Sequence, residues 1–282
     1  MHATLPQSTG GQPVNVRWTD ASRRRITNGA ADRAPQPRNV SQWAVGVTTA
    51  PRRKATLERC LKSLAAAGWE TPRLFAEPGV KLPRRFAHLP RTHRDATVGA
   101  FPNWYLALAE LVMREPRAEA YLLVQDDVVF ARNIREFLEV ALWPHPQVGV
   151  VSIYCPSDYA QGLRPGFHVE DRGWNTWTAQ ALIFPNPSAR AALASPIMLN
   201  HRHHGPRQGM RNIDCAVGAW CLSAGRPFYV FTPSLAEHVG DTSTLFRGAR
   251  TWGRRRSATF VGKHFDVARE ANLSKSVEIA TI

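Results

Sequence analysis

Two adjacent carboxylates, Asp126 and Asp127, are the side chains of this chain whose type and position most clearly suggest chemistry. They directly follow residues 121–124, an apolar run that predicts a buried strand. Ligands of open α/β sheets bind beyond the carboxyl ends of the strands, which is where this pair falls. Two like charges there repel each other, and a divalent cation such as Mg²⁺ or Mn²⁺ would relieve the repulsion. The alternative is a pair of solvated turn residues.

A histidine, His238, lies in a segment of small residues, 232–244, that follows the apolar run 228–231. Imidazole binds divalent transition metals, so His238 is a candidate metal ligand. The alternative is a loop histidine whose nitrogens are hydrogen-bonded within the protein. Taken alone, His238 favours the second interpretation.

Hydrophobic periodicity predicts the elements that would position these side chains. Residues 44–49 are typical of a buried strand, 57–64 of an amphipathic helix and 73–76 of a second strand, which together make one βαβ unit. The alternation continues with a helix from Asn103, the strand 121–124, a helix capped by Asn133 and strands at 148–154 and 181–184. A helix at 186–194 follows, opened by Asn186 as cap and Pro187 in its first turn. The last predicted elements are a helix at 214–223 and a strand at 228–231. We therefore predict one three-layer α/β domain over 41–265 with a mostly parallel central sheet.

Composition limits the class of protein. The 282 residues are 44% hydrophobic, which is enough for a core and excludes disorder of the whole chain. No apolar run reaches the roughly 18 residues of a membrane-spanning helix. The start of the chain lacks the apolar core of a signal peptide, and the four cysteines form no paired motif. We therefore expect a cytoplasmic protein, which would be in the host cytoplasm if it is encoded by a phage. Residues 1–40 are predicted to be a basic flexible tail and 266–282 a second tail.

The charge is strongly basic, with 36 Lys+Arg against 22 Asp+Glu and a net charge of +14. An arginine-rich solvated surface would explain it. A polyanionic partner, such as nucleic acid, an anionic membrane surface or a phosphorylated substrate, would explain it equally. Charge alone therefore does not name the function.

Four motifs occur together in an order typical of one family. Residues 45–52 (VGVTTAPR), 125–127 (QDD), 233–244 (PSLAEHVGDTST) and 256–262 (RSATFVG) resemble motifs of nucleotide-sugar glycosyltransferases of the GT-A fold. Within these, the chain is most similar to the N-acetylglucosaminyltransferase IV type and its bacterial and phage relatives. The resemblance covers about residues 43–265 and implies a GT-A fold and a metal-dependent transfer of sugar from a nucleotide-diphosphate sugar, a UDP-sugar by default.

The resemblance also implies roles for individual residues. Asp127 and His238 would hold Mn²⁺ or Mg²⁺. The donor nucleotide would be bound by Thr48, Thr49, Ala50, Glu77, Asn103, Asp126 and Arg247. Two positions depart from the family pattern: Gln125 stands where the D-x-D element usually has an acid, and Glu237 replaces the usual Gln, so that its carboxylate is a further candidate for the metal shell.

An inverting transferase needs a base for the acceptor hydroxyl, and the resemblance assigns that role to Asp214. The alternative is that Asp214 is an N-cap of the helix that follows. The acceptor region of the family falls near Trp174, Thr176, Trp177 and Gln180, whose tryptophans could instead belong to the core. His201, His203 and His204 form a histidine-rich loop, and the arginines 247, 250 and 254–256 could contact phosphate or form a solvated patch.

Several functions remain open at this stage. The acceptor could be a hydroxylated base in DNA, which would explain the basic charge, or a glycan of surface polysaccharide or glycoconjugate synthesis. A different class would be a non-catalytic nucleic-acid-binding protein on a degenerate transferase scaffold. A nucleotidyltransferase also uses an α/β sheet with metal-binding carboxylates. The P-loop, dinucleotide, hydrolase-elbow and zincin motifs are absent from the sequence.

Overall fold

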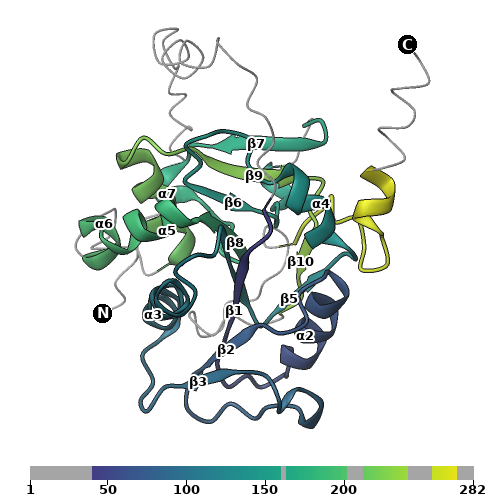
Figure 1. Ribbon diagram of the computed structural model, residues 1–282, viewed down its shortest axis with the longest axis vertical. Helices are drawn as coiled ribbons and strands as arrows, with labels where there is room; N and C mark the ends of the chain where they lie inside the picture. The colour runs from purple at the N-terminus through teal and green to yellow at the C-terminus, as the bar shows by residue number, and fades with distance from the viewer. Residues whose placement is uncertain (1–39, 160–162, 202–211, 241–255, 272–282) are drawn as a thin grey trace, which may run out of the picture. The chain divides into compact units, whose positions relative to one another are not determined.

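An eight-stranded sheet runs through the part of the chain that the computed structural model describes, residues 40–159, 163–201, 212–240 and 256–271 (Figure 1). The strand order is β3-β2-β1-β4-β8-β6-β9-β7. Only β8 and β7 run against the other six strands. The bounds are β1 (Trp43–Thr49), β2 (Arg73–Ala76), β3 (Arg91–His93), β4 (Ala120–Gln125), β6 (Val150–Ser152), β7 (Gly166–Glu170), β8 (Ala181–Pro185) and β9 (Phe228–Thr232).

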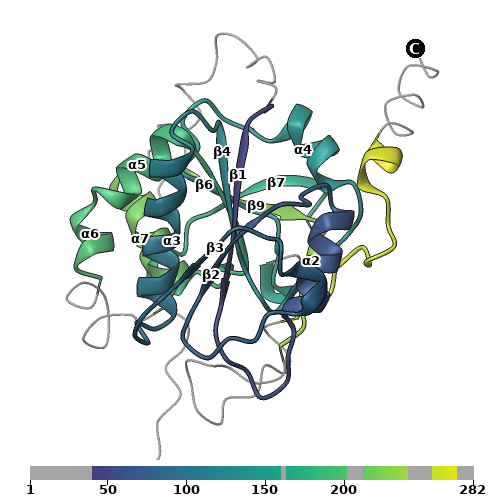
Figure 2. The same cartoon turned by 60° about the horizontal axis from the view of Figure 1, so that its bottom comes forward.

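Helices cover both faces of this sheet, and Figure 2 shows α3, α5 and α7 on one side and α2 and α4 on the other. The helices are α2 (Leu57–Ala66), α3 (Ala100–Arg114), α4 (Ile134–Ala141), α5 (Asn186–Leu193), α6 (Pro196–Leu199) and α7 (Ile213–Ser223), with short 3₁₀ turns η1 (Arg84–Phe86), η2 (Ser157–Tyr159) and η3 (Gly173–Asn175). No described helix has the length and apolarity needed to cross a bilayer.

The core consists of two apolar clusters, because successive side chains of a strand point to opposite faces. On β4, Leu122 and Val124 pack in the cluster beneath α2 and α4. Tyr121 and Leu123 pack in the other cluster, with Trp104 of α3. The predicted α/β fold with a mostly parallel central sheet and helices on both faces is therefore confirmed.

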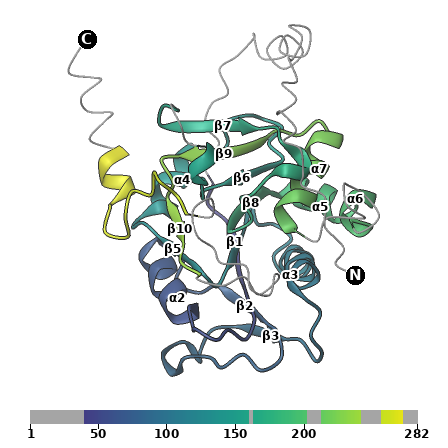
Figure 3. The ribbon, with the colours of Figure 1, turned by 180° about the vertical axis from the view of Figure 1, so that it is seen from behind.

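A second, two-stranded sheet pairs β5 (Val128–Phe130) with β10 (Ala236–His238) in antiparallel register. Figure 3 shows these strands side by side, next to α2. The sequence pattern predicted neither strand, because each has only three residues and neither shows a period of its own. This small sheet matters because it joins the segment after Asp127 to the segment that carries His238.

Neither predicted asparagine cap makes a capping hydrogen bond. Asn133 does stand at the N-cap position of α4, whereas Asn186 is the first residue of α5, whose N-cap is Pro185. Asn133 precedes α4 in a left-handed conformation, φ 54°, and its Nδ2 donates to Asp266 Oδ2 at 2.8 Å instead of capping the helix. The side chain of Asn186 donates to the carbonyl oxygens of Pro116 and Ala118. In both cases a long-range partner competes successfully with the local cap.

The packed part of the chain also extends past residue 265, where the domain was predicted to end. Val267 and Ala268 are buried, and Val267 belongs to the core cluster beneath α2 and α4. The predicted tail 1–40 falls almost wholly outside the described residues, as do residues 272–282.

Helix α7 is held directly against η3 by a glycine, and this contact yields a prediction. A Cβ on Gly218 would lie 2.4 Å from the Gly173 carbonyl oxygen and 2.6 Å from Thr176 Oγ1. Although alanine favours helices by about 1 kcal/mol, we expect Gly218→Ala to lower the free energy of unfolding by about 1–3 kcal/mol. Urea denaturation followed by circular dichroism measures this change. Ser223→Ala, at the exposed end of α7, is the control, expected within about 0.5 kcal/mol of the parent; equal stability of the two variants would contradict the prediction.

Candidate active site

The candidate site lies where the strand order of the main sheet reverses. The chain passes from β1 outward to β2 and β3, and then returns to place β4 on the other side of β1. The crevice at such a switch point, beyond the carboxyl ends of the strands, is the usual ligand site of open α/β sheets. Here the register pairs Thr48 with Gln125, and the amide of Asp126 donates to the Thr48 carbonyl at 3.2 Å.

A cavity of about 710 Å³ opens at this point, and it gathers most of the side chains that the sequence singled out. The predicted site residues that line it are Thr48, Thr49, Ala50, Glu77, Asn103, Asp126, Asp127, Asp214 and His238. Arg247 lies outside the described residues. Segments up to 190 residues apart in sequence thus meet in one cavity, although this placement does not by itself establish their roles.

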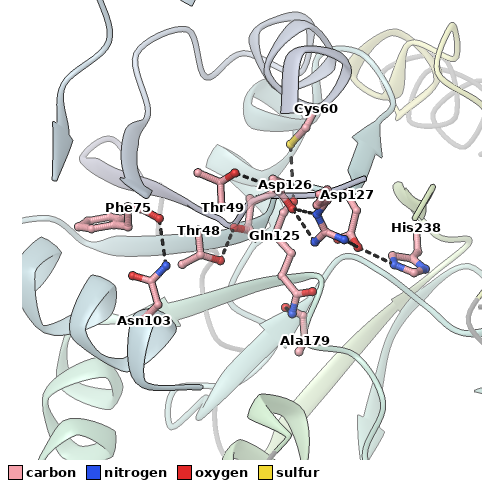
Figure 4. A network of polar contacts seen from close by, with 12 residues as sticks. Thr48, Thr49, Cys60, Phe75, Asn103, Gln125, Asp126, Asp127, Ala179 and His238 are labelled. Atoms are coloured by element: carbon pink, nitrogen blue, oxygen red, sulfur yellow. Dashed lines mark hydrogen bonds and ion pairs between the residues drawn. The ribbon is translucent and has the colours of Figure 1, made fainter. Parts of the chain in front are cut away.

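The two carboxylates are buried and share a cation, Arg52. Its Nε and Nη2 lie 2.7 and 2.6 Å from Asp126 Oδ1, and its Nη1 lies 2.9 Å from Asp127 Oδ2. The Thr49 hydroxyl donates to the other oxygen of Asp126 at 2.6 Å (Figure 4). Arg52 belongs to a motif noted in the sequence, but no role was predicted for it, since it precedes the carboxylates by more than 70 residues and only the fold brings it to them.

The surroundings shift the pKa values of the two carboxylates in opposite directions. Burial is the largest influence on Asp126 and raises its pKa, although the charge of Arg52 opposes the shift. Burial acts on Asp127 in the same direction, but the hydrogen bond to His238 and the charges of His238 and Arg52 outweigh it and lower the pKa of Asp127. These surroundings therefore favour the ionised form more strongly for Asp127 than for Asp126.

His238 reaches Asp127 because β10 pairs with β5. The register sets His238 opposite Val128, the residue after Asp127, and His238 Nε2 lies 3.0 Å from Asp127 Oδ2. Gly240 keeps this corner open, since a Cβ there would lie 2.6 Å from Asp127 Oδ2 and 3.0 Å from His238 Nε2. Asp127 Oδ1 and His238 Nδ1 are buried without a hydrogen-bond partner.

The proposed place of Glu237 in the metal shell is wrong. Strand alternation turns Glu237 away from His238, and its Oε1 accepts from the Ser257 amide at 3.2 Å. Glu237 lines a separate hollow on the other side of β10. Gln125 does line the main cavity, with its Nε2 donating to the Ala179 carbonyl at 3.3 Å. In the described residues no group of three His, Cys, Asp or Glu side chains converges, so the protein offers Asp127 and His238 as a pair.

Glu77 and Asn103, predicted to bind the nucleotide, line the cavity but are already engaged within the protein. The Glu77 carboxylate accepts from the amides of Val98 and Gly99 at 3.1 and 2.9 Å, which fixes the loop entering α3. Asn103 donates to the Phe75 carbonyl at 3.0 Å and accepts from Arg94 Nε at 3.0 Å. Both side chains shape the wall of the cavity, and their direct contact with a nucleotide stays a prediction.

The same cavity is lined by Asp214, in the first turn of α7. The N-cap of α7 is Asn212, so the alternative interpretation of Asp214 as the cap is wrong. The positive end of a helix dipole stabilises a carboxylate in this position. Asp158, which the sequence reasoning missed, lines the same cavity.

The other side chains of the expected acceptor region divide between cavity and core. Trp177, 43% exposed, and Gln180 line the cavity. Thr176 is fully buried and Trp174 packs against the core. His201 is buried and stacks on Phe101 with ring centroids 3.6 Å apart, which makes it a packing residue, while His203 and His204 lie outside the described residues.

Comparisons with known proteins give only distant likenesses to solved structures. No protein-family model matches the chain, and no curated protein matches it. Among solved structures, GalNAc-T7 with UDP, GalNAc and Mn²⁺ matches at 6% identity and a TM-score of 0.49, over 72% of this chain and 44% of that one. The mannosyltransferase PcManGT from Pyrobaculum calidifontis, with GDP-Man and Mn²⁺, matches at 20% identity and a TM-score of 0.38, over 58% of this chain and 50% of that one.

The chain therefore spans about half the length of these two proteins or less. Likenesses this distant carry no argument about activity. The fold class rests on the sheet and helices described above, and the function has to be argued from the cavity.

Proposed function

We propose that this chain is a metal-dependent glycosyltransferase of the GT-A fold that moves a sugar from a nucleotide-diphosphate sugar to a hydroxyl group. The observation that carries the proposal is the cavity at the switch point, which is lined both by the pair Asp127–His238 and by Asp214. A UDP-sugar is the default donor, from the resemblance of the motifs. The two structural neighbours, GalNAc-T7 with UDP, GalNAc and Mn²⁺ and the mannosyltransferase PcManGT with GDP-Man and Mn²⁺, are consistent with this class.

The residues present fit a divalent cation. Asp127 Oδ1 is a buried carboxylate oxygen without a partner, and Gly240 leaves the space beside Asp127 and His238 free of a side chain. His238 Nε2 lies 3.0 Å from Asp127 Oδ2, so the two side chains meet closely enough to hold one cation together. Two protein ligands suffice where water and substrate phosphates complete the shell, as they commonly do for Mg²⁺.

Asp127 and His238 would hold Mn²⁺ or Mg²⁺. When bound, such an ion supplies positive charge to the diphosphate and stabilises the departing nucleotide. Asp214 takes the proton of the acceptor hydroxyl as its oxygen forms a bond to the anomeric carbon. The bond from that carbon to the diphosphate oxygen breaks, and the nucleotide leaves with its electron pair. Attack opposite to the leaving group inverts the anomeric centre.

Donor binding provides the first test. A panel of nucleotide sugars with Mn²⁺ is expected to contain one that raises the melting temperature, because a ligand that binds only the native state stabilises it by mass action. Asp127→Asn should remove the Mn²⁺-dependent part of this shift, because it weakens the negatively charged ligand. Glu237→Gln, on the other face of β10, is the matched control and should keep it. A panel without any Mn²⁺-dependent shift would contradict the proposed donor site.

The catalytic base provides the second test. Asp214→Asn removes the proton acceptor and is expected to lower kcat by about 10²–10⁴-fold while the thermal shift with donor persists. The control is Asp158→Asn, a carboxylate of the same cavity, which should retain far more activity. Near-normal turnover of Asp214→Asn would overturn the assignment, and loss in Asp158→Asn alone would transfer the role to Asp158.

Metal-dependent hydrolysis of a nucleotide sugar separates this enzyme from a non-catalytic nucleic-acid-binding protein, which would show none. A nucleotidyltransferase would instead release pyrophosphate from a nucleoside triphosphate. Product analysis of the same reaction therefore distinguishes all three classes.

For the acceptor we propose a polyanionic molecule, with a hydroxymethylated base in DNA as the first candidate. Two adjoining hollows beside α2, β5 and β10 support it, since they share Arg59 and Lys263. Their basic lining residues are Lys54, Arg59, Lys62, Arg132, Arg256, Lys263 and His264. They contain only two carboxylates, Glu58 and Glu237, and Glu58 is paired with Lys62 at 2.5 Å. A glycan acceptor of surface polysaccharide synthesis is the alternative and needs no such groove.

Salt dependence tests this proposal. The double variant Arg59→Glu/Lys263→Glu is expected to weaken duplex DNA binding and to reduce the slope of log K against log salt by about two, one unit for each phosphate that the protein no longer neutralises. Fluorescence anisotropy of a labelled duplex measures both. Arg84→Glu/Arg91→Glu has the same charge change outside the hollows and should leave the slope nearly unchanged. No duplex binding by the parent protein at low salt would exclude DNA as acceptor.

A further inference from the structure

Arg52 faces the proposed ion site from inside the protein. Its side chain is only 13% exposed, and those of Asp126 and Asp127 are 3% and 6% exposed. It also lines the cavity at the switch point. A buried guanidinium thus stands against the same oxygen, Asp127 Oδ2, that His238 contacts.

The charges explain why a cation is needed there. With both carboxylates ionised, the charge of Arg52 leaves one negative charge uncompensated in a buried site. A divalent cation would overcompensate it and would also repel the guanidinium at the same carboxylate. Arg52 and a divalent cation are therefore competitors for Asp127 until a further anion enters the cavity.

The contacts of Arg52 are unequal. Two of its nitrogens, Nε and Nη2, contact Asp126, whereas Nη1 alone contacts Asp127. Asp126 is held in addition by the hydroxyl of Thr49. Arg52 can therefore give up Asp127 while it remains attached to Asp126, which keeps the released nitrogen at the cavity.

We propose that Arg52 is an exchangeable counter-ion: it neutralises Asp127 in the ion-free protein, yields that carboxylate to the divalent cation, and then binds the donor diphosphate. This inference rests on the proposed function for the identity of the ion and the donor. A guanidinium is well suited to the second task because its planar fork matches phosphate oxygens. The exchange also couples the two ligands, because the donor's negative charge offsets the excess positive charge of ion and Arg52 together.

The test is a Mn²⁺ titration followed by electron paramagnetic resonance, which reports free Mn²⁺, with and without UDP. For Arg52→Met, we expect Mn²⁺ alone to bind about tenfold more tightly than to the parent, because the competitor is gone. UDP should then increase the Mn²⁺ affinity several-fold less than in the parent, since the coupling between two ligands is reciprocal and typically about 5–150-fold. Arg53→Met, at the exposed neighbouring position, is the control and should match the parent in both respects.

The opposite sign would overturn the inference. Unchanged or weaker Mn²⁺ binding by Arg52→Met means that Arg52 is a fixed support of the carboxylates. If that variant does not fold, Arg52→Met/Asp126→Asn removes one charge of each sign, leaves Asp127 intact and should bind Mn²⁺ more tightly by the same factor. Absence of Mn²⁺ binding by the parent protein even with UDP would contradict the ion site of the proposed function, and the inference with it. Mn²⁺ binding by the parent with no gain in the variant contradicts the inference alone.

Discussion

The burial of two adjacent carboxylates at the end of β4 is the constraint on which the rest of the site depends. Removing Asp126 and Asp127 from water is costly unless each oxygen finds a donor or a cation. Strand β1 supplies both, through the Thr49 hydroxyl and the Arg52 guanidinium just beyond its end. The pairing of β1 with β4 is thus required by the charges as well as by the apolar packing beneath them.

The same constraint reaches the last described part of the chain. His238 contacts Asp127 only because β10 pairs with β5, and β10 is itself supported by the segment that follows the undescribed residues 241–255. Arg256 donates to the His238 carbonyl, and the Ser257 amide donates to Glu237. Alternation along β10 therefore sends its two polar side chains in opposite directions, with the histidine to the cavity and the glutamate to the support. His238 and Glu237, which are neighbours in one sequence motif, are thus held by contacts with residues from distant parts of the chain.

How far the sequence predicts this arrangement depends on the range of the interactions. The strands and helices around the switch point follow from apolar periods of 2 and 3.6, so β1, β2, β4 and α2 agree with expectation to within two residues at each end. The gathering of Asp127, His238 and Asp214 was expected only through family resemblance. Arg52 had no signal, because nothing in its neighbourhood reveals a partner more than 70 residues away. The side-chain capping bonds expected at Asn133 and Asn186 do not form for the same reason, since both side chains donate to distant partners.

The distribution of charge also bears on the kind of acceptor. Asp158 and Asp214 are among the residues that line the cavity, and their carboxylates would repel a phosphate of the acceptor beside them. The hollows on the other side of β10 are basic.

A small anionic acceptor would satisfy only one of these regions. A neutral hydroxyl group carried on a polyanionic chain satisfies both, because the hydroxyl can approach Asp214 while the phosphates remain outside on the basic surface. A base turned out of a DNA duplex has that form, and its release from the stack costs only a few kcal/mol. The basic charge of the chain and the carboxylates Asp158 and Asp214 of its cavity are then consistent with the one acceptor proposed above.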